Sequence, residues 1–380
     1  MDDFLVIGKG LFGAAAARYL SGGAGRVTIL GPDEPDEGAA APVHGSHYDA
    51  GRLTGLLGRS ETWSRLARSS IAQYRPLEAA SGVRFYEPRG RLHVPAGRRA
   101  PRPEAQTTYH TPESLRQAFP YLRFPPGFDA LFEHAPAGLI NPRALVQAQL
   151  AVAQRNGARV VRETAVRLDL SRDGVTVTTE RGTTLRARKV LLATGAFANC
   201  FGLSPRPLPL RVKSETIILA EVDASEAARL AEAPVLDYEL ESDVLEGIYM
   251  TPPLAYPDGR FYLKMGCNTT ADQFFDDCDA MRAWFVAGDS GQVKEAMAAA
   301  LRSILPDLAV QRLATKRCIV TYTPSDHPII DAIAPGRVYA AVGGNGTGAH
   351  ASDGVGRAAA GLVAEGVWPS DLPRALFKLA

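Results

Sequence analysis

The chain has 380 residues and carries 42 Lys and Arg against 41 Asp and Glu, so its net charge is close to zero. One hydrophobic core rarely serves a chain of this length, and we expect two structural domains. The balanced charge offers no basic field for a polyanion, which argues against a nucleic-acid partner. No apolar run is long enough to cross a bilayer, and Met1 opens no secretory leader pattern. We therefore expect a cytoplasmic protein without a membrane partner.

The chain begins with an apolar strand, three spaced glycines and an alanine-rich helix. The strand covers residues 4–7, and Gly8, Gly10 and Gly13 follow before the helix. Gly8 permits a tight turn, Gly10 lets the backbone approach a diphosphate, and Gly13 lets helix and strand pack closely. The free N–H groups at the helix start face the anion. This pattern predicts a dinucleotide site, with a tight turn that binds no ligand as the alternative.

The second strand, at residues 27–30, lacks the acidic residue that normally contacts a ribose. Gly31 stands at that position. The contact is therefore missing or displaced to Asp33 or Glu34, and the identity of the cofactor cannot rest on it. The Pro- and Gly-rich segment 33–45 reads as a surface loop.

The middle of the chain alternates helical and strand-like segments. We expect helices at 61–80 and 141–156, separated by a proline-rich insertion at 83–134 that contains short strands. Further strands are expected at 159–162, 166–170, 175–179 and 189–195, and the last of these ends on Gly195. Strands between 211 and 266 predict a separate mixed or antiparallel sheet, which helical segments at 279–304 would cover.

The chain returns through strands at 317–323 and 338–342 to a second glycine loop, which contains Gly344, Gly346 and Gly348. A helix follows from about residue 352 to residue 363. Its N-terminus is electropositive and would stabilise negative charge on the pyrimidine edge of a reduced flavin, which a nicotinamide would not need. The alternative is an ordinary Gly-rich turn.

These segments together resemble the FAD-dependent amine and amino-acid oxidase superfamily, and within it the branch of monomeric sarcosine oxidase, N-methyltryptophan oxidase and pipecolate oxidase. The resemblance is carried by the N-terminal glycines and by residues 45–52, 141–143, 193–195, 262–266, 318–327 and 346–356. It implies an α/β chain, α+β overall, in which a Rossmann-like FAD-binding domain is interleaved with a substrate domain on a mixed or antiparallel sheet. We assign residues 1–80, 137–208 and 311–380 to the first domain, and 81–136 and 209–310 to the second.

Cys318 matches the family's cysteine that carries FAD through a thioether, so the resemblance implies a covalent flavin. A reactive thiolate needs cationic neighbours. Arg317 is adjacent in sequence, and His47 and Arg52 match the family's basic residues at the flavin edge, although their spacing is one residue longer here. A buried, unreactive Cys318 is the alternative.

Lys264 matches the family lysine whose ammonium lies near flavin N5. A fixed positive charge in a dry pocket stabilises the superoxide that forms in the first one-electron reduction of O2. The resemblance therefore favours an oxidase, and without it a lysine in a strand reads as a solvated edge residue.

The substrate side departs from the family, whose arginine and lysine grip a carboxylate. Gly55 stands at the arginine position and His350 at the lysine position. A small residue opens volume, and a histidine is only conditionally charged. We therefore expect a bulkier or less anionic amine than sarcosine, with His350 alternatively a hydrogen-bonding residue at a helix start. Tyr249 is a further candidate for the pocket wall, together with Tyr256 and Tyr262; packing in the sheet is the alternative for all three.

The resemblance implies oxidation of a secondary amine to an imine, with O2 reduced to H2O2, by a monomer or small homo-oligomer. A flavin dehydrogenase with a quinone or protein acceptor stays open, as does a non-catalytic flavin-binding subunit. A nicotinamide dehydrogenase is a weaker contender because Gly31 removes its ribose contact. Cys200, Cys267 and Cys278 are expected to be buried, unreactive thiols, and no metal site is expected.

Overall fold

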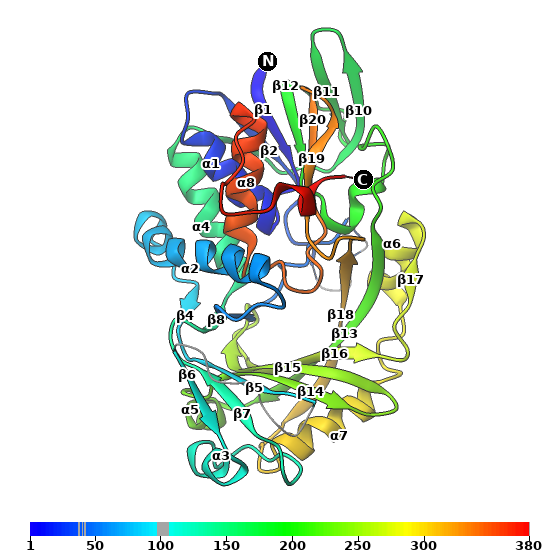
Figure 1. Cartoon of the computed structure of the whole chain (residues 1–380). Helices are drawn as coiled ribbons and strands as arrows, with labels where there is room; N and C mark the ends of the chain where they lie inside the picture. The colour runs from blue at the N-terminus through cyan, green and yellow to red at the C-terminus, as the bar shows by residue number, and fades with distance from the viewer. Residues whose placement is uncertain (37–38, 40, 42, 97–105, 380) are drawn as a thin grey trace.

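The computed structural model describes residues 1–36, 39, 41, 43–96 and 106–379. The predicted loop at 33–45 and the predicted insertion at 83–134 each include residues outside this set. Two large sheets and one small sheet organise the described chain, and the larger two lie at opposite ends of the molecule (Figure 1). The α/β architecture expected from the sequence is confirmed.

The first large sheet has eight strands in the order β10-β11-β12-β1-β2-β9, with β20 beside β12 and β19 beside β20. Its strands are β1 (Asp2–Ile7), β2 (Val27–Leu30), β9 (Arg159–Val161), β10 (Ala165–Ser171), β11 (Gly174–Thr179), β12 (Thr184–Leu192), β19 (Ile329–Ala334) and β20 (Val338–Val342). The central strands β9, β2, β1, β12 and β20 run parallel. Parallel strands need covered faces, which explains why β2 and β20 are buried throughout.

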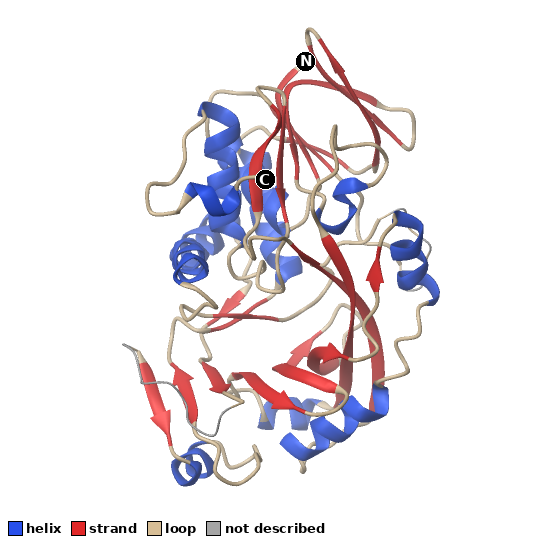
Figure 2. Cartoon of the chain, turned by 45° about the vertical axis from the view of Figure 1, so that its right-hand side comes forward, coloured by secondary structure: helices blue, strands red, loops and turns tan. Residues whose placement is uncertain are grey.

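Three helices from distant parts of the sequence cover this parallel layer. They are α1 (Leu11–Ser21), α4 (Pro142–Arg155) and α8 (Ser352–Glu365). They lie side by side on one face of the strands, as Figures 1 and 2 show. Glycine and alanine allow this approach: a Cβ at Gly356 would lie 2.4 Å from the Cβ of Ala15. The N- and C-terminal segments therefore share one hydrophobic core.

The second large sheet has nine strands in the order β17-β13-β16-β15-β14-β5-β7-β6, with β18 beside β13. Its strands are β5 (Arg91–Val94), β6 (Thr107–His110), β7 (Ala130–Glu133), β13 (Arg211–Val222), β14 (Val235–Glu241), β15 (Leu245–Ala255), β16 (Phe261–Thr269), β17 (Phe274–Phe275) and β18 (Arg312–Tyr322). Most pairs are antiparallel, and β14 with β5 is parallel. The predicted domain boundary at 311 is wrong, because β18 pairs with β13 over its whole length.

The remaining elements join or cover these sheets. The small sheet holds β3 (Arg52–Thr54), β4 (Tyr86–Glu87) and β8 (Gly138–Ile140), and the helices are α2 (Glu61–Ser81), α3 (Pro112–Ala118), α5 (Ala224–Arg229), α6 (Cys278–Ala287) and α7 (Lys294–Ile304), with short 3-10 turns η1 (Gly195–Asn199) and η2 (Arg374–Phe377). The helical segments expected at 279–304 are α6 and α7, and the backbone at Gly288 turns to an extended conformation between them.

A disulfide joins Cys200, at the end of η1, to Cys278, the first residue of α6. The expectation that both were unreactive thiols is therefore wrong. Cys267 and Cys318 are free, and Cys267 is buried as expected. The expected reducing cytoplasm assumed four free thiols, and disulfides are rare in reducing compartments. The cytoplasmic location stays a prediction from the sequence.

Candidate functional site

A cavity of about 440 Å³ is lined by residues from both large sheets and from both ends of the chain. The predicted cofactor residues that line it are Gly8, Gly10, Gly195, Cys318, Gly344, Gly346 and Gly348, together with Arg52. The predicted site residues His47, Tyr249 and His350 also line it. Segments more than 300 residues apart in sequence therefore form one site.

Each of the three N-terminal glycines meets a different structural requirement. Gly8 has a φ of 102°, and a Cβ there would lie 2.3 Å from the carbonyl oxygen of Ala193. Gly13 lies outside the cavity lining, and a Cβ there would lie 1.8 Å from the carbonyl oxygen of Gly8. Gly10 is the N-cap of α1 and supplies no capping side chain. The first N–H groups of α1 are therefore left for an anion, while Gly13 serves the packing of the helix on the strand.

The end of β2 carries no acidic group toward the cavity. Gly31 lines it, but Asp33 and Glu34 do not. Asp33 forms an ion pair with Lys9, and Glu34 accepts from the Arg143 guanidinium at 2.6 and 2.5 Å. The expected displacement of a ribose contact to Asp33 or Glu34 is therefore not found.

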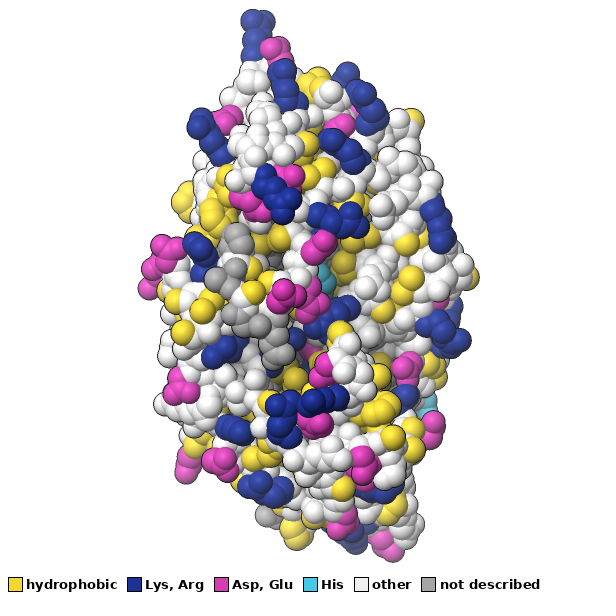
Figure 3. Space-filling model, turned by 180° about the vertical axis from the view of Figure 1, so that it is seen from behind, with side chains coloured by type: hydrophobic (Ala, Val, Ile, Leu, Met, Phe, Trp, Pro, Cys, Tyr) yellow, Lys and Arg dark blue, Asp and Glu magenta, His cyan; other side chains and the backbone are white. Residues whose placement is uncertain are grey.

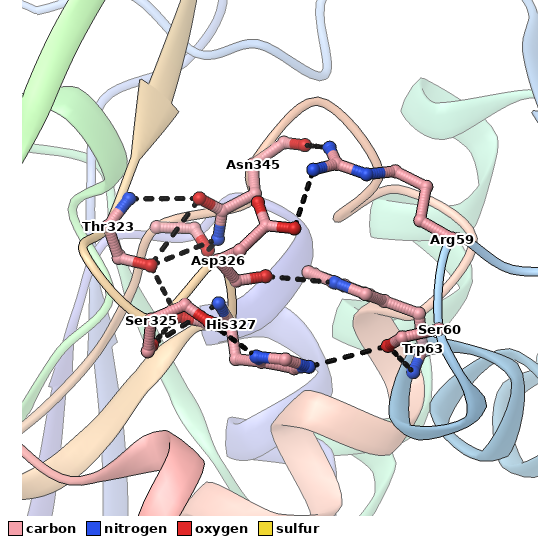
Figure 4. A network of polar contacts seen from close by, with 9 residues as sticks. Arg59, Ser60, Trp63, Thr323, Ser325, Asp326, His327 and Asn345 are labelled. Atoms are coloured by element: carbon pink, nitrogen blue, oxygen red, sulfur yellow. Dashed lines mark hydrogen bonds and ion pairs between the residues drawn. The ribbon is translucent and has the colours of Figure 1, made fainter.

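A polar network fixes the C-terminal glycine loop (Figure 4). Asn345 is fully buried with a φ of 49°, its Oδ1 accepts from Thr323 N at 2.9 Å, and its Nδ2 donates to the Gly343 carbonyl at 2.9 Å. Arg59 donates to the Asn345 carbonyl at 2.9 Å and to Asp326 at 2.6 Å. Asn tolerates the left-handed conformation, so the loop is held open beside the cavity by the end of β18 and the start of α2.

Lys264 is fully buried and does not itself line the cavity. Its Nζ lies 2.7 Å from Asp49 Oδ2, donates to the Gly51 carbonyl, and lies 5.2 Å from the centre of the Tyr249 ring. Arg52 forms an ion pair with the same carboxylate. Burial, and then the charge of Arg52, hold the pKa of Lys264 well below its usual value. The lysine therefore lies behind Arg52 and Tyr249, which line the cavity.

The Cys318 thiol lines the cavity directly across the β13–β18 pairing from Glu215, which also lines it. Burial and then Glu215 raise the thiol pKa, against the lowering effect of Arg52. Arg317 donates instead to the carbonyls of Gly288 and Phe285, so the expected effect of Arg317 on the thiol is not found.

His47 is not the cation expected at the flavin edge. Burial, and then the charges of Lys9, Arg143 and Arg52, lower its pKa to about 3. The imidazole is therefore neutral at pH 7. It lies beside Gly10, at the diphosphate end of the cavity, since a Cβ on Gly10 would lie 3.5 Å from its Nδ1.

The structure does not show the open volume that the sequence predicted at Gly55. Gly55 does not line the cavity, and a Cβ there would lie 2.6 Å from Glu133 Oε2. The volume expected from this small residue is thus filled by the Glu133 carboxylate, which accepts from the backbone of Leu56 at 2.5 Å. Tyr256 and Tyr262 also lie outside the lining, and Tyr256 donates to Asp49 at 2.8 Å.

His350 lines the cavity and is only 8% exposed. Burial, and then the charge of Arg91, lower its pKa to about 4, so it is neutral at pH 7. Its backbone carbonyl accepts from the buried Tyr74 hydroxyl at 3.0 Å. The conditional charge expected from the sequence is therefore absent near neutrality.

Comparison with known proteins identifies the fold and the family. The model of the family described as "FAD dependent oxidoreductase" matches residues 3–362. The chain belongs to this family. Monomeric sarcosine oxidase of Streptomyces avermitilis is 26% identical over 343 residues, which cover 86% of this chain and 84% of that protein.

Solved structures of other family enzymes share the fold. NikD, described as an unusual amino acid oxidase essential for nikkomycin biosynthesis, superimposes with a TM-score of 0.78 at 22% identity and covers 100% of this chain and 97% of its own. The fructosamine oxidase Amadoriase II of Aspergillus fumigatus gives a TM-score of 0.76 at 19% identity, covering 100% and 89%. At these identities the likeness concerns the fold.

The chain's own residues fit FAD. The uncapped start of α1 and the close approach at Gly8 suit the diphosphate, and the C-terminal loop with Gly344, Gly346 and Gly348 lines the other side of the same cavity. Bound FAD would supply a two-electron acceptor. In this FAD-dependent oxidoreductase, residues from both chain ends would therefore hold the cofactor.

The sequence did not single out four charged residues of the cavity: Lys9, Arg91, Glu215 and Asp237. Arg91 and Glu215 lie in strands that the sequence predicted, but only pairing across the sheet brings them to the cavity. Asp237 lies in β14, where acidic residues alternate with apolar ones. That alternation was the available signal for a half-buried strand.

The rest of the molecule offers no competing site among the residues described. No helix in this part of the chain is long and apolar enough to span a membrane. Within the same residues, no group of three His, Cys, Asp or Glu side chains is placed to hold a metal ion. The face in Figure 3 mixes basic and acidic side chains, without a field of one sign.

Proposed function

We propose that this FAD-dependent oxidoreductase oxidises a secondary amine or amino-acid derivative to an imine and passes the electrons to O2, which leaves as H2O2. The observation that carries the proposal is the buried Lys264–Asp49 pair behind the wall of the FAD cavity. The similar proteins support it, since their names describe oxidases of sarcosine, amino acids and fructosyl amines.

Different residues of the chain accept the substrate proton and supply positive charge for the reaction with O2. FAD supplies the electron acceptor. Glu215 is a carboxylate of the cavity wall whose Oε1 accepts from the Tyr249 hydroxyl at 2.6 Å, and it can take the proton that an ammonium loses before oxidation. Lys264 and Arg52, held by one Asp49 carboxylate, provide positive charge where O2 gains its first electron.

The substrate of this proposal is less anionic than sarcosine. Gly55 and His350 replace the arginine and lysine of the family's carboxylate site, Glu133 fills the space over Gly55, and burial keeps His350 neutral. We further propose that the protein is a monomer or small homo-oligomer, is located in the cytoplasm and acts on a small amine. The similarity to a sarcosine oxidase named as monomeric supports the proposed oligomeric state.

We keep the thioether between FAD and Cys318 as part of the proposal. The thiol lines the cavity, and the Arg52 guanidinium favours its thiolate, against burial and Glu215, which raise the thiol pKa. Acid precipitation should leave a yellow pellet for the natural chain and a colourless pellet for Cys318→Ser. Release of all flavin from both proteins would contradict the linkage.

The proposed activity is tested by adding a panel of secondary amines to the oxidised holoprotein without air. We expect at least one amine to bleach the flavin absorbance, and admission of air to restore it with one H2O2 per FAD. Bleaching with slow recovery and little peroxide would instead identify a dehydrogenase with another acceptor. No bleaching by any amine would favour a non-catalytic flavin-binding subunit.

A further inference from the structure

One end of the FAD cavity carries an arginine and an aspartate side by side. Arg91 belongs to β5 and Asp237 to β14, two parallel neighbours in which Asp237 pairs with His93. Both Arg91 and Asp237 line the cavity, and Arg91 Nη2 lies 2.5 Å from Asp237 Oδ2. The register of these two adjacent strands therefore places a hydrogen-bond donor, Arg91, beside a hydrogen-bond acceptor, Asp237, in the cavity wall.

The positive charge of Arg91 is already balanced. Besides the Asp237 contact, its Nη1 donates to the Leu57 carbonyl at 2.8 Å and lies 4.0 Å from Glu133 Oε2. Arg91 and then His93 hold the pKa of Asp237 below its usual value, so this aspartate is ionised at neutral pH. His350, whose pKa is near 4, adds no charge. A substrate carboxylate would find no net positive charge at this end of the cavity.

In the part of the chain that the structure describes, Arg91, Asp237 and His350 nevertheless keep unused hydrogen-bond donors and acceptors. Asp237 Oδ1 accepts no hydrogen bond from the described residues, whereas Oδ2 faces Arg91 and His93. The guanidinium has five N–H groups, of which the contacts with Asp237 Oδ2 and Leu57 O use two. Nε2 of His350 is buried and has no partner within the described chain. The patch can both donate and accept, without net charge.

We propose that Arg91 and Asp237 bind an uncharged group that both accepts and donates hydrogen bonds, so that the substrate is an amine bearing a carboxamide in place of a carboxylate. The carboxamide oxygen accepts from Arg91, and its N–H donates to Asp237 Oδ1. A carboxylate in that place sets its second oxygen against Asp237 Oδ1, where the carboxamide has an N–H donor. This inference rests on the proposed amine oxidation and specifies its substrate.

The test compares two ligands that differ only in this group, methoxyacetamide and methoxyacetate. An ether oxygen replaces the amine, so neither ligand can form an imine and both report binding alone. Each is titrated into the oxidised holoprotein, with the shift of the flavin absorption band and calorimetry as readouts. We expect the amide to bind at least about ten-fold more tightly than the acid.

Variants then assign that preference to the patch. Asp237→Asn removes the carboxylate in direct contact with the Arg91 guanidinium, so the ratio of the two affinities should fall at least about five-fold in favour of the acid. Asp237→Ser should shift the ratio in the same direction and serves as a second variant of different shape. Glu239→Gln, the same change on the same strand at a residue outside the cavity lining, should leave the ratio unchanged.

The inference is overturned if the natural chain prefers the acid, if it binds neither ligand, or if both Asp237 variants keep the ratio of the natural chain. Its failure is distinct from that of the proposed function. A chain that oxidises amines but prefers the acid contradicts the carboxamide site alone. A chain that prefers the amide but is bleached by no amine contradicts the proposed oxidation alone.

Discussion

Asp49 is the residue that organises the charges behind the cavity wall. It binds both Lys264 and Arg52, and it also accepts from the Tyr256 hydroxyl. Burial and Arg52 lower the pKa of Lys264, and the contact with Asp49 favours its charged form against them. With Lys264 charged, one carboxylate faces two cations, which leaves a local excess of positive charge. An interior charge of this kind is preorganised, since its partners hold it in place before the reaction.

Replacing Lys264 by Met should slow the reaction of the reduced holoprotein with O2. The variant removes positive charge where superoxide forms, and the loss of one such group typically costs roughly ten- to a thousand-fold in rate. Stopped-flow re-oxidation of chemically reduced enzyme measures it.

The matched control is Lys213→Met. Lys213 forms another buried ion pair, 2.5 Å from Asp272, and lies outside the cavity lining. We expect this variant to lose stability and to keep its re-oxidation rate. An equal rate in Lys264→Met and in the natural chain would remove Lys264 from the oxygen reaction.

His350 should make stability depend on pH. Its folded pKa, about 4, lies below the unfolded value of 6.5, so the unfolded chain binds more protons between these values. The free energy of unfolding therefore falls as the pH is lowered through this window, by up to about 1.4 kcal/mol per pH unit for this group.

His350→Gln should flatten that slope by up to about 1.4 kcal/mol per pH unit. Urea unfolding at several pH values and one FAD concentration measures it. The exposed His134 provides the control, because His134→Gln should leave the slope unchanged. An unchanged slope in His350→Gln would mean that His350 is protonated in the folded state.

Residues required by backbone conformation are easier to predict from the sequence than residues that form buried ion pairs. Gly8 and Gly10 could be found because a turn and a diphosphate require them at fixed spacing. The partners Asp49 of Lys264 and Asp237 of Arg91 could not, because each pair joins segments more than 140 residues apart. The outcome at His47 depends on burial, which no local pattern records.

At the scale of elements, a buried polar network ties α1, α4 and α8 together. Asp353 at the start of α8 is fully buried, and it accepts from Arg18 at 2.7 Å, from Tyr19 at 2.6 Å and from Gln149 at 2.7 Å. The contacts join α1, whose first two residues line the FAD cavity, to α4 and α8. The helix start therefore has its own structural anion within its first turn.

Asp353→Ala should destabilise the protein by about 3 kcal/mol, because it leaves the mostly buried Arg18 without its counter-ion. Denaturant unfolding of the holoprotein measures this loss. The exposed pair Arg282–Asp279 supplies the comparison, and Asp279→Ala should leave stability nearly unchanged. Equal stability of both variants would show that the network does not hold the helices.

Elements with strong local patterns were predicted well. The strands at 27–30 and 338–342 have the predicted bounds, and the helix expected at 61–80 is α2. The strand β14 was missed because its alternating acids resemble a loop until the partner strands bury their neighbours. The helical segments expected at 279–304 are α6 and α7, which the turn-forming stretch between Gly288 and Gly291 separates.

At the scale of the molecule, the fold joins the two chain ends over one cavity. β1 and β20 both pair with β12, and α1 packs on α8, so the first and last segments share a sheet and a helical layer. The sequence predicted this return from two glycine loops. It misplaced the boundary at 311, because β18 crosses into the other sheet before the chain returns.

The central claim is that this single cavity, built from both ends of the chain, holds FAD. The direct measurement is the FAD content of the purified protein after incubation with excess FAD and removal of the unbound cofactor. We expect one FAD per chain, and strongly reduced retention in Gly8→Val, whose side chain would collide with the Ala193 carbonyl. Protein that stays colourless under these conditions would contradict the account.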